Sequence, residues 1–194
     1  NLAAKGVREL IIIAQDTTYY GLDLYRRRAL AELLQKLSEV DGIEWIRIHY
    51  SYPAAFPEDV LDPMANNPKV CRYMDIPLQH IADKVLDNMH RNVDGAWTRE
   101  LIRKMRERVP GVVLRTTMIV GHPGEGKRAF AELLDFVREA RFERLGAFKY
   151  SEEEGTYGAD NFKDTISKRV KQERLDELMT LQSEISLAYN QSRV

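Results

Sequence analysis

The chain has 194 residues and a formal net charge of −1, which fits one domain with a sizeable core. The near-neutral charge argues against a general affinity for nucleic acid or membranes, and no apolar run approaches the roughly 20 residues that span a bilayer. The single cysteine, Cys71, excludes an internal disulfide framework and fits a reducing, cytoplasmic compartment. Because the chain opens with NLAAKG instead of Met, we expect a piece of a longer protein.

Short apolar runs alternate with amphipathic segments along the chain. The first run, ELIIIAQ at 9–15, is continuous and rich in β-branched residues, as buried strands are. The segment 28–40 has leucines at helical spacing and is followed by the helix-ending pair Asp41-Gly42. The same patterns predict further strands at 43–50, 70–76, 112–120 and 144–150. They predict further helices from Pro57 to about Asn67 and at 80–92, 97–108, 125–140 and 167–189.

This alternation predicts an α/β protein whose parallel strands are joined by helical crossovers. A flat sheet covered by helices on both sides should be apolar on both faces, whereas here polar residues recur on one face late in successive strands. That pattern favours a (β/α) barrel of the TIM type with its site at the C-terminal ends of the strands, and solvated strand ends are the alternative. The residues predicted to face the lumen are Arg47, His49 and Ser51, then Arg115, Thr117 and Ile119, and then Ala147, Lys149 and Ser151.

The stretch GHPGEGKR at 121–128 matches the first seven positions of the phosphate-binding pattern GxxxxGK[ST]. Three features oppose a phosphate loop. Arg128 stands where a magnesium-binding Ser or Thr is required, Pro123 lacks an N–H for the phosphate cradle, and Glu125 adds a negative charge. We therefore predict a glycine-built turn, with Glu125 favouring the N-terminus of the following helix through its dipole.

The other chemistry-bearing residues give weak signals. The histidines at 49, 80, 90 and 122 show no metal-binding spacing, so we expect structural roles for them. Cys71 lies in a predicted strand among apolar residues, which is typical of an inert buried thiol. The acidic run at 152–155 is expected to be a solvated loop.

Five motifs end the five predicted strands: AQDTTYYG (14–21), HYSYPAAFP (49–57), DIPLQH (75–80), RTTMIVGHPGE (115–125) and KYSEEEGT (149–156). Together they resemble the methylthiotransferase branch of the radical S-adenosylmethionine (SAM) enzymes, and within it the RimO family. AQDTTYYG and PLQH are the RimO-like forms, whereas the tRNA-modifying sister family has different residues there. The resemblance implies addition of a methylthio group to the β-carbon of an aspartate in a small-subunit ribosomal protein.

The resemblance also implies a domain arrangement and partners. Residues 1–165 would form an incomplete radical SAM barrel, and 166–194 a helix leading to an absent C-terminal domain. The family's CxxxCxxC motif, which holds a 4Fe–4S cluster, does not occur in this chain, so the ligands of the clusters would lie outside it. The implied partners are the ribosomal protein and an electron donor such as flavodoxin or ferredoxin, with no direct nucleic-acid or membrane binding.

The positions that match the family's motifs carry implied roles. Gln15 and Asp16 would hold the methionyl ammonium of SAM, and Gln79 and Arg115 its ribose hydroxyls and carboxylate. The full set expected to bind SAM is Gln15, Asp16, Gln79, Arg115, Thr117, Ile119, Tyr150 and Ser151. Within this set, Ile119 would pack on adenine and the backbone of 149–151 would contact the edge of its ring. The set expected to face the substrate is Arg47, His49, Ser51 and Lys149.

Three alternatives remain open at this point. One is the tRNA-modifying sister family. Another is an ordinary α/β-barrel lyase or aldolase, in which Lys149 at a strand end would form a Schiff base. The last is a binding module that holds no cluster and catalyses nothing.

Overall fold

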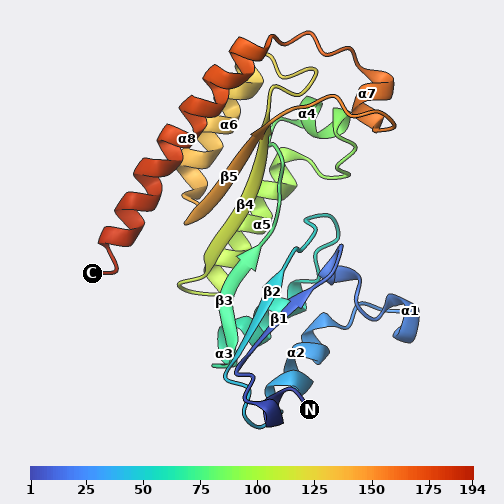
Figure 1. The fold of residues 1–194 in the computed structure, drawn as a ribbon, viewed down its shortest axis with the longest axis vertical. Helices are drawn as coiled ribbons and strands as arrows, with labels where there is room; N and C mark the ends of the chain where they lie inside the picture. The colour runs from blue at the N-terminus through green and yellow to red at the C-terminus, as the bar shows by residue number, and fades with distance from the viewer. The chain divides into compact units, whose positions relative to one another are not determined.

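The computed structural model describes residues 1–194 (Figure 1). Its strands are β1 (Glu9–Ile13), β2 (Trp45–His49), β3 (Val70–Asp75), β4 (Val113–Val120) and β5 (Arg144–Lys149). They form one five-stranded sheet in the order β1-β2-β3-β4-β5. Strand order follows chain order without a switch point, as in barrels and unlike doubly wound sheets. The five predicted strands are therefore confirmed.

Helices follow the strands, as predicted. The α-helices are α1 (Leu22–Tyr25), α2 (Leu30–Ser38), α3 (Leu61–Asn66), α4 (Asp83–Asn88), α5 (Gly95–Arg108), α6 (Lys127–Ala140), α7 (Tyr157–Asn161) and α8 (Lys168–Gln191). The 3₁₀ turns are η1 (Ala3–Lys5), η2 (Thr17–Tyr19) and η3 (Glu58–Val60). The helix predicted at 80–92 is shorter than expected, because His90 and Asn92 have positive φ angles of 58° and 53°. None of the helices has the length and apolar character needed to cross a membrane.

The chain divides into two compact units. The first unit comprises residues 1–76 and 102–114, and the second comprises 77–101 and 115–194. Core residues of the first unit include Leu34, Ile46, Ile48, Leu61, Met64 and Met74. Core residues of the second unit include Leu78, Met118, Leu133, Phe136, Val137 and Leu178.

In the first unit, one face of the sheet is covered and the other is open. Ile46 and Ile48 of β2 are buried, and α2 and α3 pack on β2 and β3. On the opposite face Ile11 and Ile13 of β1 are 55% and 70% exposed, and Ile11 is in register with Arg47. The alternation thus places Arg47 on an uncovered face, as the lumen prediction requires.

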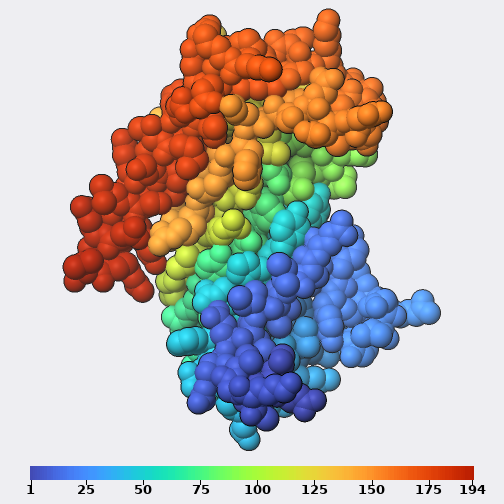
Figure 2. All heavy atoms as spheres, in the orientation of Figure 1, coloured from blue at the N-terminus to red at the C-terminus, as the bar shows by residue number.

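In the second unit, α8 lies along the sheet beside β5 and α6 (Figure 1). Figure 2 shows the atoms of this helix in red, next to the orange atoms of the segments that precede it. Leu178 and Ile185 of α8 are buried, while Gln182 Nε2 donates to the Phe142 carbonyl at 2.9 Å. Phe142 in turn packs edge-to-face on Phe136 of α6, with the ring centroids 5.6 Å apart. The long helix predicted at 167–189 is confirmed.

The side-chain direction predicted for Lys149 is wrong. Lys149 is in register with the fully buried Val120, and its Nζ donates to Gln172 Oε1 of α8 at 2.7 Å. The open face of β5 instead carries Phe148, which is 64% exposed and in register with Ile119. Lys149 still contributes to the lining of a pocket at the strand ends, but its amine is held by α8, which disfavours the lyase alternative.

Candidate functional site

The second unit holds a pocket of about 310 Å³ at the C-terminal ends of β4 and β5. Its lining includes four of the residues expected to bind SAM, namely Gln79, Ile119, Tyr150 and Ser151. His122 and Tyr157, which the prediction did not include, also line it. The structure therefore brings together residues that are up to about 70 positions apart in the sequence at the strand ends, where barrel sites collect.

Gln79 reaches the pocket from the loop after β3. Its backbone continues the sheet, because Gln79 N–H donates to Thr117 O at 2.9 Å and Ile119 N–H donates to Gln79 O at 2.8 Å. Its φ of +71° is unusual for a residue with a side chain, although six other non-glycine residues of the chain also have a positive φ. Gln79 Oε1 is buried and accepts no hydrogen bond. A buried acceptor beside a pocket fits a ligand donor such as a hydroxyl group.

Tyr150 forms the wall at the end of β5. Its N–H donates to Val120 O at 2.8 Å, and its ring lies edge-on to His122 with the centroids 4.6 Å apart. Desolvation raises the pKa of the Tyr150 hydroxyl above its ordinary value, so the group stays a neutral donor. That hydroxyl is buried and has no partner. The packing is tight, since a Cβ on Gly158 would lie 3.1 Å from His122 Nε2 and 3.2 Å from the Tyr150 hydroxyl.

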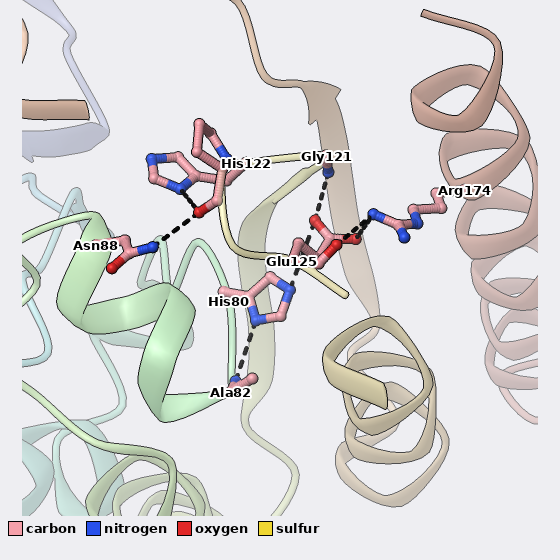
Figure 3. Close-up of polar contacts among 8 residues, drawn as sticks. His80, Ala82, Asn88, Gly121, His122, Glu125 and Arg174 are labelled. Carbon is pink, nitrogen blue, oxygen red and sulfur yellow. Dashed lines mark hydrogen bonds and ion pairs between the residues drawn. The ribbon is translucent and has the colours of Figure 1, made fainter. Parts of the chain in front are cut away.

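The stretch 121–125 is a turn, as predicted. Gly121 and Gly124 have φ angles of +77° and +93°, and Asn88 Nδ2 donates to Pro123 O at 2.9 Å (Figure 3). Gly121 N–H donates to a carboxylate oxygen of Glu125. This backbone N–H, which a phosphate loop would use to bind a nucleotide, therefore already donates to a side chain of the turn.

Glu125 itself lies in a buried polar cluster with His80 and Arg174 (Figure 3). Arg174 of α8 donates to Glu125 O at 2.9 Å and to Glu125 Oε1 at 3.1 Å. Burial raises the pKa of Glu125 to about 7, although Arg174 and the N–H groups of the turn act in the opposite direction. The expectation that Glu125 serves the helix N-terminus is wrong, because α6 begins only at Lys127 and the carboxylate points into the core.

His80 has the structural role that the prediction assigned to it. It is completely buried, and its Nδ1 accepts the Ala82 N–H at 3.0 Å. Desolvation lowers the pKa of His80 to about 3, so the ring is neutral with its proton on Nε2. That nitrogen lies 3.8 Å from Glu125 Oε2.

Sequence reasoning missed the two charged residues that α8 contributes. Lys171 and Arg174 are both buried, and the sequence analysis predicted no role for either of them. Their spacing carried a signal, since they extend the stripe of Leu178, Gln182 and Ile185 by steps of three and four residues. A cation that continues a buried stripe indicates an anionic or carbonyl partner inside the protein.

Two residues expected to bind the methionyl end of SAM lie in the first unit. Gln15 is exposed. Asp16 caps η2, with Oδ1 accepting from Thr18 N at 2.9 Å, Thr18 Oγ1 at 2.7 Å and Tyr52 N at 3.3 Å. Asp16 therefore organises the loop after β1, and its role toward a ligand stays a prediction.

The residues expected to face the substrate differ in their accessibility. Arg47 and His49 are half-buried, and Arg47 Nε pairs with Glu9 Oε1 at 2.7 Å. Ser51 is completely buried, with its hydroxyl 3.2 Å from Thr17 Oγ1. The prediction that Ser51 shares an open face with Arg47 and His49 is wrong, because the chain leaves the strand after His49.

Arg115 and Thr117 lie on the open face of β4 together with Ile119. Arg115 is exposed and Thr117 is half-buried. Neither lines the pocket that Ile119 enters. Their proposed contacts with SAM therefore remain predictions.

Residues 1–137 match the model of the Radical SAM superfamily, and the chain belongs to this family. Among curated proteins it is similar to the ribosomal protein uS12 methylthiotransferase RimO of Phocaeicola vulgatus and of Porphyromonas gingivalis, with 54% identity over 193 residues in each case. The match covers 100% of this chain but 45% and 44% of those relatives, so the chain spans less than half of their length. The predicted resemblance to RimO is confirmed.

Solved structures support the barrel class. Coproporphyrinogen III oxidase (HemN) of Escherichia coli, a radical SAM enzyme, aligns with a TM-score of 0.70 and 21% identity over 92% of this chain and 41% of its own. The radical SAM methyltransferase TsrM of Kitasatospora setae aligns with a TM-score of 0.57 and 20% identity over 76% of this chain and 28% of its own. At these identities the likeness concerns the fold, and it confirms the partial barrel.

Proposed function

We propose that this chain is the SAM-binding part of an enzyme that adds a methylthio group to the β-carbon of an aspartate in ribosomal protein uS12. The observation that carries the proposal is the 54% identity, over the whole chain, to proteins named uS12 methylthiotransferase. The structure is consistent with the proposal, because several of the strand-end residues that resemble the RimO family line one pocket.

The adenosyl end of SAM fits the residues of the pocket. Ile119 offers an apolar surface for the adenine ring, and Gln79 Oε1 offers a buried acceptor for a ribose hydroxyl. The buried Tyr150 hydroxyl, which has no partner, adds a donor. When bound and reduced, SAM supplies a carbon radical that abstracts hydrogen from a substrate. The role of these residues is to hold the adenosyl group in one orientation and to exclude water.

A 4Fe–4S cluster does not fit the residues of this chain. Such a cluster needs three or four thiolates, and the chain has one cysteine. No group of three His, Cys, Asp or Glu side chains is arranged to hold a metal ion. We therefore assign the cluster ligands to other parts of the complete protein, and assign no step of cluster chemistry to the residues here.

The remaining roles complete the proposal. Gln15 and Asp16 would bind the methionyl ammonium of SAM, and Arg115 its carboxylate. Arg47 and His49 would face the substrate protein. A soluble electron donor such as flavodoxin or ferredoxin would supply the reducing electron in the cytoplasm.

The test uses the complete, cluster-loaded protein with SAM, a reductant, and either purified uS12 or tRNA. Mass spectrometry should find a methylthio group on one aspartate of uS12 and none on tRNA. A uS12 variant with that aspartate replaced by alanine is the matched control and should remain unmodified. Modification of tRNA alone would assign the chain to the sister family instead.

A further inference from the structure

Lys171 of α8 is a buried cation whose partners lie at the edge of the pocket. It is 5% exposed. Its Nζ donates to the Tyr150 carbonyl at 2.9 Å and forms an ion pair with Asp164. A buried ammonium without such partners would be strongly destabilising. Asp164 and the Tyr150 carbonyl together provide these partners.

Lys171 also packs against both strand ends. Its side chain fills the space beside Gly121, where a Cβ would lie 2.4 Å from Lys171 Cγ. Its ammonium lies 4.9 Å from the centroid of the Tyr150 ring. One turn later on the same helix, Arg174 holds Glu125 (Figure 3). The helix therefore anchors the ends of β4 and β5 through two cations.

The hydrogen bond from Lys171 Nζ to the Tyr150 carbonyl determines how the peptide between Tyr150 and Ser151 is oriented. No peptide bond of the chain is cis, and in a trans peptide the C=O and the following N–H point in opposite directions. Because the Tyr150 carbonyl points to α8, the Ser151 N–H points to the other side of the strand. Ser151 is among the residues that line the pocket, and no group of the protein accepts a hydrogen bond from its N–H.

We propose that Lys171 is a positioning residue. It fixes the Tyr150–Ser151 peptide so that the Ser151 N–H donates to an acceptor ring nitrogen on the amino-group edge of adenine. The inference rests on the proposed function, namely that this pocket takes the adenosyl group of SAM. A backbone N–H donor held in this orientation favours a base with a hydrogen-bond acceptor at that position. It disfavours a base that presents a donor at the same position.

The test compares two ligands whose bases differ at this ring nitrogen and at the adjacent C6, which carries an amino group in one and a carbonyl group in the other. S-adenosylhomocysteine presents an acceptor at N1, whereas S-inosylhomocysteine presents an N–H donor. Their affinities for the complete, cluster-loaded protein are measured by calorimetry for the wild type, for Lys171→Met, and for Lys168→Met. Lys168 is an exposed lysine of the same helix and provides the matched control.

We expect the wild type and Lys168→Met to prefer the adenosyl ligand by roughly tenfold, the effect of one well-placed hydrogen bond. In Lys171→Met the preference should fall to roughly twofold or less, because the peptide is no longer fixed. Should Lys171→Met fail to fold, Asp164→Asn, which removes the anionic partner and keeps the lysine, should lower the preference in the same direction.

Two outcomes overturn the inference in different ways. Equal weakening of both ligands in Lys171→Met, with the preference retained, would mean that Lys171 only stabilises the fold. A wild-type protein that binds neither ligand would contradict the proposed function, and the positioning role with it.

Discussion

Replacing Arg174 by Met should lower the unfolding free energy, because it removes the cationic partner of the buried Glu125 carboxylate. The Glu125 side chain is 0% exposed and that of Arg174 is 10% exposed, so removing the cation leaves a buried charge without its partner. Where Glu125 is ionised, breaking such a pair costs on the order of 3–5 kcal/mol in unfolding free energy. In the double variant Arg174→Met/Glu125→Gln no uncompensated charge remains, so the loss should be smaller than in Arg174→Met alone.

The pH dependence provides an independent check. The pKa of Glu125 in the folded chain is raised to about 7 by burial, and Arg174 lowers it, so Arg174→Met should raise it further. Between the unfolded pKa of about 4.3 and the folded value, the folded state binds more protons, and stability therefore falls as pH rises through that window. The deficit of Arg174→Met should thus be larger at about pH 8 than at about pH 5.5.

Urea unfolding of the wild type, both single variants and the double variant at the two pH values measures these quantities. A loss below about 1 kcal/mol in Arg174→Met, equal at both pH values, would be typical of a surface pair and would refute the buried-pair account. Additive losses in the double variant would refute the coupling between the two side chains.

The other predictions concern the pocket and the turn. Gln79→Leu should weaken S-adenosylhomocysteine binding by roughly tenfold in calorimetry, through loss of the acceptor for the ribose hydroxyl, and an unchanged affinity would remove Gln79 from the site. Gly121→Ala should lower the melting temperature, because the new Cβ would lie 2.4 Å from Lys171 Cγ at a φ of +77°. Gly126→Ala, with open space around the new Cβ, is the matched control, and equal melting temperatures would contradict the packing described. ATP with magnesium should not raise the melting temperature, whereas a real site at 100 times its Kd would add about 2.7 kcal/mol.

Local patterns predicted the elements well, because the strands and helices rest on residues close in sequence. The strand expected at 9–15 and the long helix expected at 167–189 both appeared in the structure. The face of β5 was assigned wrongly. The alternation puts Ala147 and Lys149 on one face and Phe148 on the other, but it does not show which face is the lumen and which is covered by helices. Only the register with β4 decides that question.

The buried charges could not be predicted locally for a different reason. Glu125 is stable in the core because Arg174, 49 positions later, reaches it. Likewise the peptide at Tyr150 is held by Lys171, 21 positions later. Pairings of this kind depend on how α8 packs against the sheet, which hydrophobic periodicity fixes only approximately.

The most direct test of the central claim is the mass of uS12 from cells in which the gene for the complete protein is deleted. The account predicts that uS12 lacks its methylthio group in the deletion strain and regains it with the wild-type gene. It predicts much lower recovery with Gln79→Leu than with Gln191→Leu, which alters an exposed residue of α8 outside the pocket. A uS12 that keeps its methylthio group in the deletion strain would contradict the account.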